Sequence, residues 1–241
     1  MRSPRPVTAP VARRTADLPA VERSPADRRK VQPPAGRTPS RDVEQALVDA
    51  AERVLVRDGP DAVTVRAVAQ EAGVAPMGVY NRFGGKDGLV DALLIRGFDG
   101  LRDAIAPHGE SDPTERLINA GLRYRQFALA NSAHYLAMFD DAIHQEQQSA
   151  EVMPHAQAAF TELVGHVRYG MVGGDLMTGD PFEIAQQIWS TVHGAVQLEI
   201  KGMLKVEDAD RTYRNLLQTL HRGLRAQSST PITSLHAPDP S

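Results

Sequence analysis

Apolar residues recur every three to four positions along most of the chain after residue 40, which is the spacing of an amphipathic α-helix. The first such run follows Ser40, a candidate N-cap, and stops at the turn-forming sequence Asp58-Gly59-Pro60. We therefore expect a helix over 41–58, whose apolar face is made of Val43, Ala46, Leu47, Ala50, Ala51, Val54 and Leu55.

Two short helices are expected next. Thr64 is placed to cap a helix that stops at Gly73. The next helix begins near Ala75, has Pro76 in its first turn, and runs to Gly84-Gly85.

Longer helical patterns fill the rest of the chain. No stretch alternates apolar and polar residues as a half-buried strand would, and we find no internal repeat or heptad array. The sequence therefore predicts an all-α fold. The longer helices are expected over 86–106, 113–131, 150–171, 181–204 and 207–226, with a short helix over 134–143.

Two short helices joined by a turn that contains glycine, after a longer helix, form the pattern of a helix-turn-helix. Gly73 lets the chain reverse in this turn because glycine tolerates the backbone conformation that a tight turn requires. Both short helices have an apolar face that would be buried, made of Val65, Val68, Ala69, Ala72, Val79 and Phe83.

The distribution of charge within the folded part of the chain favours DNA binding at this motif. The net charge is −3, and acidic residues outnumber basic ones over 41–106 and again over 107–241. No Asp or Glu lies between Ala75 and Lys86, so the second short helix has an outer face without acidic side chains. In a helix-turn-helix this helix enters the major groove of DNA.

From Val43 to Leu94 the chain resembles the DNA-binding domain of TetR-family regulators. The resemblance lies in the helix lengths, the turn glycines, the Tyr80-x-x-Phe83 pair and the Lys86 that follows it. It implies a three-helix DNA-binding domain over 41–88, joined by the helix at 86–106 to a helical domain over 107–227 for ligand binding and dimerisation.

The family resemblance also implies a function. It implies a one-component regulator, a repressor by family habit, that binds a palindromic operator in double-stranded DNA as a homodimer. A small, largely apolar effector would release it. No cofactor is expected.

Individual positions acquire roles through the same resemblance. Thr64 and Lys86 would contact phosphate groups, Arg66 a phosphate or a base edge, and the phenol of Tyr80 the DNA backbone. Asn and Arg side chains can read adenine and guanine edges, although a phosphate contact is expected for Arg82. The residues expected to contact DNA are Thr64, Arg66, Pro76, Met77, Gly78, Tyr80, Asn81, Arg82 and Lys86.

Three positions depart from the usual family pattern. Ala75 stands where a capping Ser is common, so the recognition helix lacks a side-chain cap. Gly78 replaces a more usual Ala, Ser or Thr, and Arg82 replaces a common His. The operator sequence therefore does not carry over from relatives.

The second half of the chain carries Trp189, His193 and Gly194 in a W-x-x-x-H-G order, and resembles a TetR-type C-terminal subfamily named after these residues. The sequence HYLAMF at 134–139 fits the same subfamily. The residues expected to line a ligand pocket are Arg123, Phe127, Tyr135, Met138, Phe139, Trp189 and His193, although the same spacing is also typical of core packing.

By analogy with the family, the last two long helices would pair with their copies in a second subunit as a four-helix bundle. The apolar residues of the first of these helices then have two alternatives, the core of their own chain or the dimer seam. These residues are Ile184, Ile188, Val192, Ala195 and Val196.

The two ends of the chain have a different composition. Residues 1–40 hold eight of the 17 prolines and carry a net positive charge, which predicts a disordered arm that either follows DNA or has no role. We expect residues 228–241 to form a loose tail. The chain has no Cys and no apolar stretch of membrane-spanning length, so we expect a cytoplasmic protein without disulfides.

Three other classes of function compete with a ligand-controlled DNA-binding protein. An enzyme is disfavoured because neither a G-x-S-x-G elbow nor an H-E-x-x-H sequence occurs. A metal-sensing regulator is an alternative because Asp140, Asp141 and His144 could share one helix face, while His144, His155 and His166 are spaced too widely for one ion. A helical scaffold without DNA binding is the third alternative.

Overall fold

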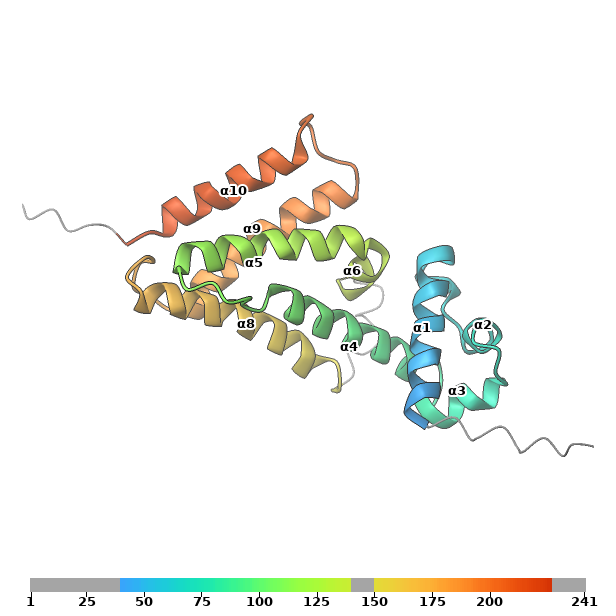
Figure 1. Cartoon of the computed structure of the whole chain (residues 1–241). Helices are drawn as coiled ribbons and strands as arrows, with labels where there is room; N and C mark the ends of the chain where they lie inside the picture. Colours follow the sequence, from blue (N-terminus) through green and yellow to red (C-terminus); the bar gives the residue numbers. More distant parts are fainter. Residues whose placement is uncertain (1–39, 140–149, 227–241) are drawn as a thin grey trace, which may run out of the picture. The chain divides into compact units, whose positions relative to one another are not determined.

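The computed structural model describes residues 40–139 and 150–226, and these residues form an all-α fold, as the sequence predicts (Figure 1). The predicted arm before Ser40, the tail after 227, and the second half of the helix expected over 134–143 lie outside them. The helices are α1 (Ser40–Asp58), α2 (Val65–Glu71), α3 (Pro76–Phe83), α4 (Lys86–Ile105), α5 (Pro113–Ala130), α6 (Ser132–Met138), α8 (Met153–Val172), α9 (Pro181–Ile200) and α10 (Ala209–Leu224), with a 3-10 turn at Pro60–Ala62.

Helix starts follow from short-range capping. The hydroxyl of Thr64 accepts a hydrogen bond from the backbone N–H of Ala67 at 3.2 Å, and so caps α2. Asp112, Asp180 and Asp208 cap α5, α9 and α10 in the same way. Because a side-chain oxygen here satisfies a backbone donor that the helix leaves free, these boundaries lie close to the predicted ones.

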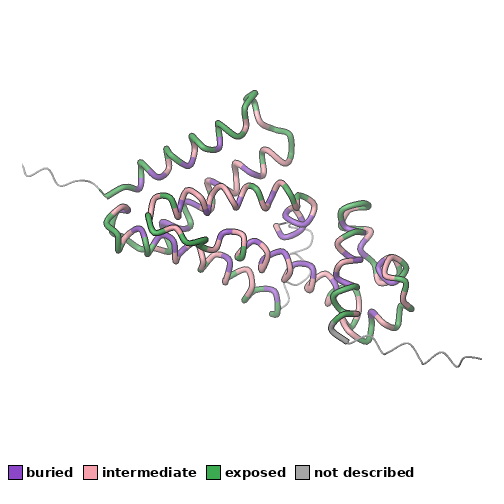
Figure 2. Tube along the Cα trace, in the orientation of Figure 1, coloured by how far each residue is buried: buried purple, intermediate pink, exposed green. Residues whose placement is uncertain are grey.

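Buried side chains form two hydrophobic cores among the described residues. The first core belongs to α1–α4 and includes the fully buried Leu47, Val54 and Val79. The second belongs to α4–α6 and α8–α10. Figure 2 shows the buried positions recurring along one side of each helix, as the sequence periodicity requires.

Helix α4 contributes to both cores. Leu89 and Leu93, in its first half, pack into the first core. Phe98, Leu101 and Ile105, in its second half, pack into the second core. A displacement of α4 would therefore disturb the packing of both groups of helices.

Three histidines hold α4 against its neighbours. His134 of α6 lies 2.6 Å through its Nε2 from the carbonyl oxygen of Leu93. His155 of α8 lies 2.8 Å through its Nδ1 from a carboxylate oxygen of Asp99. His166, also of α8, lies 2.8 Å through its Nε2 from the carbonyl oxygen of Ile105. Polar contacts thus hold α4 from its middle, at Leu93, to its last residue, Ile105.

The apolar side of α9 serves the core of its own chain. Ile184, Ile188, Val192 and Val196 are each at most 5% exposed, and Ala195 packs partly buried against them. Phe182 and Leu198 on the same helix remain 47% and 44% exposed. Any contact between two subunits through α9 would therefore use the second set of residues.

The described helices include none that is both long enough and apolar enough to cross a membrane.

Candidate nucleic-acid interface and ligand cavity

The turn between α2 and α3 has the geometry of a helix-turn-helix. Gly73 adopts φ 68°, a left-handed conformation that side chains disfavour. The N–H of Val74 then bonds to the carbonyl of Ala69 at 2.9 Å, which closes the turn. Val79 is fully buried in the first core, so one face of α3 is fixed and the other faces outward.

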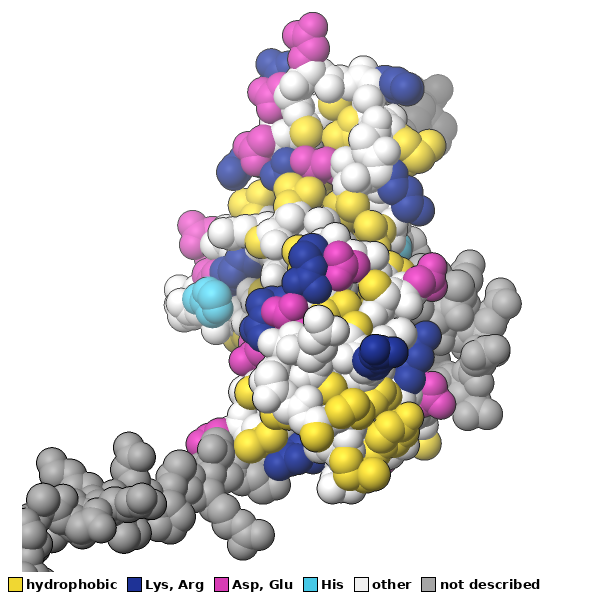
Figure 3. Space-filling model, turned by 90° about the vertical axis from the view of Figure 1, so that its right-hand side faces the viewer, with side chains coloured by type: hydrophobic (Ala, Val, Ile, Leu, Met, Phe, Trp, Pro, Cys, Tyr) yellow, Lys and Arg dark blue, Asp and Glu magenta, His cyan; other side chains and the backbone are white. Residues whose placement is uncertain are grey.

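The residues predicted to contact DNA are mostly exposed. Met77 and Tyr80, on the outer face of α3, are 64% and 52% exposed, although large apolar side chains are usually buried. Gly78 and Arg82 are half-buried, while Thr64, Arg66, Pro76, Asn81 and Lys86 are exposed. Figure 3 views the molecule from the side on which α1–α3 lie in Figure 1, and hydrophobic side chains gather beside basic ones in its lower part.

Arg82 bends back along its own helix. One of its terminal nitrogens, Nη1, donates a hydrogen bond to the carbonyl of Gly78 at 3.1 Å. A Cβ at position 78 would lie 3.9 Å from the same nitrogen. The departures from the family pattern at 78 and 82 are therefore neighbours in space.

The start of α3 has no side-chain cap. Ala75 stands at the N-cap position and makes no side-chain hydrogen bond, while Pro76 occupies the first turn. Proline is favoured there because its fixed φ suits a helix and its missing N–H would have no partner in the helix.

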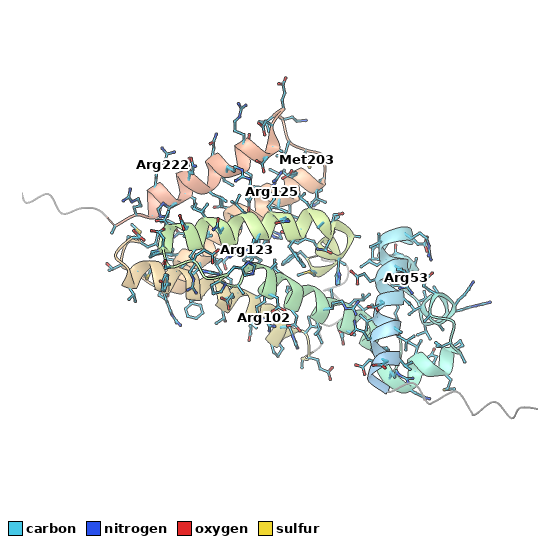
Figure 4. The ribbon with its side chains drawn as sticks, viewed as in Figure 1. Arg53, Arg102, Arg123, Arg125, Met203 and Arg222 are labelled. Atoms are coloured by element: carbon cyan, nitrogen blue, oxygen red, sulfur yellow. The ribbon has the colours of Figure 1, made fainter. Side chains whose placement is uncertain are left out.

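Several arginines on the surface of the first core are paired with acidic side chains, among them Arg53, which Figure 4 labels. Arg53 and Arg57 of α1 bond to Glu71 of α2 at 2.8 and 2.9 Å. Arg66 and Lys86, by contrast, form no salt bridge with any acidic side chain of the described residues. Their charges are therefore available to phosphate groups.

A cavity of about 290 Å³ lies within the second core. Apolar side chains from α4, α5, α6, α8, α9 and α10 line it, and its polar lining groups are Tyr124, Gln186, Trp189 and His221. A concave site that is mostly apolar with a few polar groups is typical of small-molecule binding.

The structure brings part of the predicted pocket together. Met138, Phe139 and Trp189 line the cavity. Tyr135 and His193 lie outside its lining but are bonded to Tyr124, which does line it. The prediction did not include Tyr124, and no local signal in the sequence distinguishes it from other buried aromatic residues.

Arg123 and Phe127 do not join the cavity. Arg123 bonds to the carboxylate of Glu110 at 2.7 Å and to the carbonyl of Ala106 at 3.0 Å, and so holds the loop between α4 and α5. The ring of Phe127 lies 3.1 Å from where a Cβ of Gly100 would be, at the crossing of α4 and α5. Both positions follow from contacts with helix α4 and the loop after it.

Tyr124, Tyr135 and His193 form a buried triangle of polar atoms. The two phenolic oxygens lie 2.7 Å apart, and they lie 3.0 and 2.7 Å respectively from Nδ1 of His193. Burial raises the pKa of Tyr124 to about 12 and lowers the pKa of His193. The triangle is therefore uncharged at neutral pH.

The metal site that the sequence offers as an alternative is not tested by the described residues. Asp140, Asp141 and His144 are outside the described residues. His155 and His166 contact Asp99 and Ile105 instead, and no group of three metal-ligating side chains is found among the residues described.

An exposed helix-turn-helix, connected by one helix to a domain with a mostly apolar cavity, points to a DNA-binding regulator as the class of protein. Residues 47–93 match the family model described as bacterial regulatory proteins, tetR family. Residues 117–220 match the family model described as tetracyclin repressor-like, C-terminal domain. This match does not distinguish the Trp-His-Gly subfamily, so that assignment stays a prediction. The chain belongs to the TetR family of bacterial transcriptional regulators.

Individual relatives agree with this family. The chain is 33% identical over 141 residues to the HTH-type transcriptional regulator BetI of Rhizobium meliloti, an alignment that covers 56% of this chain and 68% of that protein. It is 27% identical over 160 residues to the HTH-type regulator YvkB of Bacillus subtilis, covering 64% and 81%. A solved structure of a protein with unknown function from Rhodococcus sp. RHA1 is 30% identical with a TM-score of 0.69, covering 77% of this chain and 96% of that one.

Proposed function

We propose that this protein is a repressor that binds a palindromic operator in double-stranded DNA as a homodimer and is released by a small, largely apolar effector. The observation that carries the proposal is the double role of α4. Phe98, Leu101 and Ile105 of this helix line the cavity, while its Leu89 and Leu93 pack against the helices of the helix-turn-helix. A ligand that displaces the cavity wall would therefore displace the support of α3.

One feature of α9 supports the dimeric part of the proposal. Phe182 and Leu198 leave apolar surface exposed on α9, where the family analogy expects the second subunit. A two-fold dimer presents two recognition helices, which favours an operator made of two inverted half-sites.

The finer assignment to the Trp-His-Gly subfamily belongs to the same proposal. Trp189 and His193 lie one helical turn apart on α9, with ring centroids 5.5 Å apart. Phe139 of the HYLAMF sequence packs against His193 at 4.5 Å between centroids. The residues that carry the resemblance thus form one aromatic cluster beside the cavity.

Gel retardation tests the DNA-binding role. We expect the full chain to retard a fragment from the region upstream of its own gene, and the half-sites to lie about 10 bp or a multiple apart. Affinity is expected to fall steeply with salt because bound phosphates release counterions. If no fragment of the genomic neighbourhood is retarded, the proposal fails.

Replacing Lys86 by Ala is expected to weaken operator binding about tenfold, because a charged hydrogen bond to phosphate would be lost. The salt dependence should become shallower by about one phosphate contact. Lys205→Ala is the matched control, since Lys205 is an exposed lysine in the segment between α9 and α10. Equal losses for both variants would count against a specific contact by Lys86.

A further inference from the structure

The lining of the cavity carries no formal charge. None of the described residues that line it is Asp, Glu, Lys or Arg. His221, its one histidine, has a pKa lowered by burial and is therefore neutral at pH 7. Since burying an unpaired charge is strongly unfavourable, such a wall selects against ionised ligands.

Two arginines are sequence neighbours of a cavity-lining residue, but each is paired with a glutamate outside the cavity (Figure 4). Arg123 and Arg125 flank Tyr124 on α5. Arg123 bonds to Glu110 at 2.7 Å, and Arg125 bonds to Glu199 at 2.6 Å through its Nη2. Neither guanidinium group is left to neutralise a carboxylate in the cavity.

The lining of the cavity extends over two or more turns of the helices that contribute to it. Its lining residues on α5 run from Leu117 to Tyr124, which spans about 10 Å of helix. On α8 they run from Met153 to Leu163, which spans about 15 Å. The side chains between these limits are mostly aliphatic or aromatic, so the extent and chemistry of the lining suit an extended hydrocarbon chain.

His221, a polar residue that lines the cavity, already has a hydrogen-bond partner on α5. Nε2 of His221 lies 3.2 Å from the hydroxyl of Thr114. Thr114 stands ten residues before Tyr124 on α5, about 15 Å along the helix axis.

Tyr124 is the member of the polar triangle that lines the cavity. When the proton of the neutral His193 ring is on Nε2, Nδ1 can only accept a hydrogen bond. The three contacts of the triangle then have two protons between them, one from each phenol. Both phenols then donate within the triangle, and the group left to meet a ligand is the acceptor capacity of the Tyr124 oxygen. In this tautomer a ligand hydroxyl can donate to the Tyr124 oxygen, whereas a ligand carbonyl meets no donor of the triangle.

We propose, resting on the function proposed above, that the cavity binds an uncharged, largely aliphatic molecule whose hydroxyl group donates a hydrogen bond to the phenolic oxygen of Tyr124. The apolar walls bury the chain, and the triangle selects the head group.

The head group is tested with three probes of equal chain length: 1-decanol, sodium decanoate and decylamine hydrochloride at pH 7.5. Trp189 is the only Trp of the chain and lines the cavity, so its fluorescence reports binding without DNA. We expect saturable binding of decanol, at least about tenfold tighter than that of either ion. Equal or tighter binding of an ion, or no saturable binding of decanol, would overturn the proposal.

The hydrogen bond is tested with Tyr124→Phe, which should weaken decanol binding about fivefold. Tyr213→Phe is the matched control: Tyr213 is another buried tyrosine, whose hydroxyl donates to the carbonyl of Gly121 at 3.0 Å and which does not line the cavity. It should bind decanol as the unaltered chain does. Unchanged binding by the Tyr124 variant, or an equal loss in both variants, would refute the contact.

Fluorescence titration and gel retardation separate this inference from the proposed function. A chain that binds the operator but prefers decanoate keeps its regulatory role and loses only the proposed ligand class. A chain that binds decanol but no DNA contradicts the regulatory role instead.

Discussion

Replacing Gly88 by Ala is expected to abolish operator binding. A Cβ at this position would overlap the carbonyl oxygen of Phe83 and lie 3.0 Å from its carbonyl carbon. Phe83 is the last residue of α3, so the obstacle is backbone and not a flexible side chain. The recognition helix would have to move away from α4, and the free energy of unfolding should fall by about 2–3 kcal/mol.

Gly165→Ala is the matched control for this substitution. Gly165 lies within α8, and a Cβ there would meet nothing within 4 Å. Alanine should therefore stabilise this helix by about 0.5–1 kcal/mol and leave operator binding unchanged. Urea unfolding and gel retardation measure the two effects. Full operator binding by the Gly88 variant would show that α3 and α4 tolerate a wider spacing.

Lowering the pH from 8 to 5 is expected to destabilise the protein strongly. Burial lowers the pKa of His166, His193 and His221 from the ordinary value of 6.5. Protonating His166 would also place a proton on Nδ1, which accepts a hydrogen bond from the Arg116 guanidinium at 2.9 Å. Folding is therefore favoured by keeping these rings neutral.

The sign and window of this effect follow from proton uptake. Unfolded histidines bind protons below pH 6.5, while the folded chain resists protonation, so stability is complete above 6.5 and is lost as the pH falls. Each ring contributes up to about 1.4 kcal/mol per pH unit. The carboxyl of Glu110, whose pKa is lowered to about 2 mainly by Arg123, loses its contribution only below pH 4.5.

Urea unfolding at several pH values and fixed protein concentration measures this slope. His166→Gln should make the dependence of the unfolding free energy on pH shallower, by at most the contribution of one histidine. His108→Gln is the control and should not change it, because the side chain of His108 is exposed. A free energy of unfolding that stays constant between pH 8 and 5 would contradict the prediction.

The helix-turn-helix could be predicted from sequence because short-range chemistry determines it. Thr64 caps α2 through a residue three positions away, and Gly73 turns the chain by its own φ. Periodicity identified Val79 as buried because a helix repeats its faces at a constant interval. Each of these signals lies within a few residues of the structure that it produces.

The cavity could be predicted only in part because it depends on contacts far apart in sequence. Arg123 and Tyr124 are adjacent on α5, yet Arg123 turns to Glu110 while Tyr124 reaches His193 on α9. Periodicity indicates that a residue faces inward but not which helix it meets. The roles of Phe98 and Leu101 in the cavity wall likewise required the positions of α5 and α8.

The membership of α4 in both cores has a consequence for the regulatory equilibrium. If a bound ligand lowers the affinity for the operator by a given factor, the operator must lower the affinity for the ligand by the same factor, because the two coupling free energies are one quantity. A repressor seated on DNA therefore senses its effector less sensitively than the free protein does. The concentration at which a gene is induced would then depend on how strong its operator is.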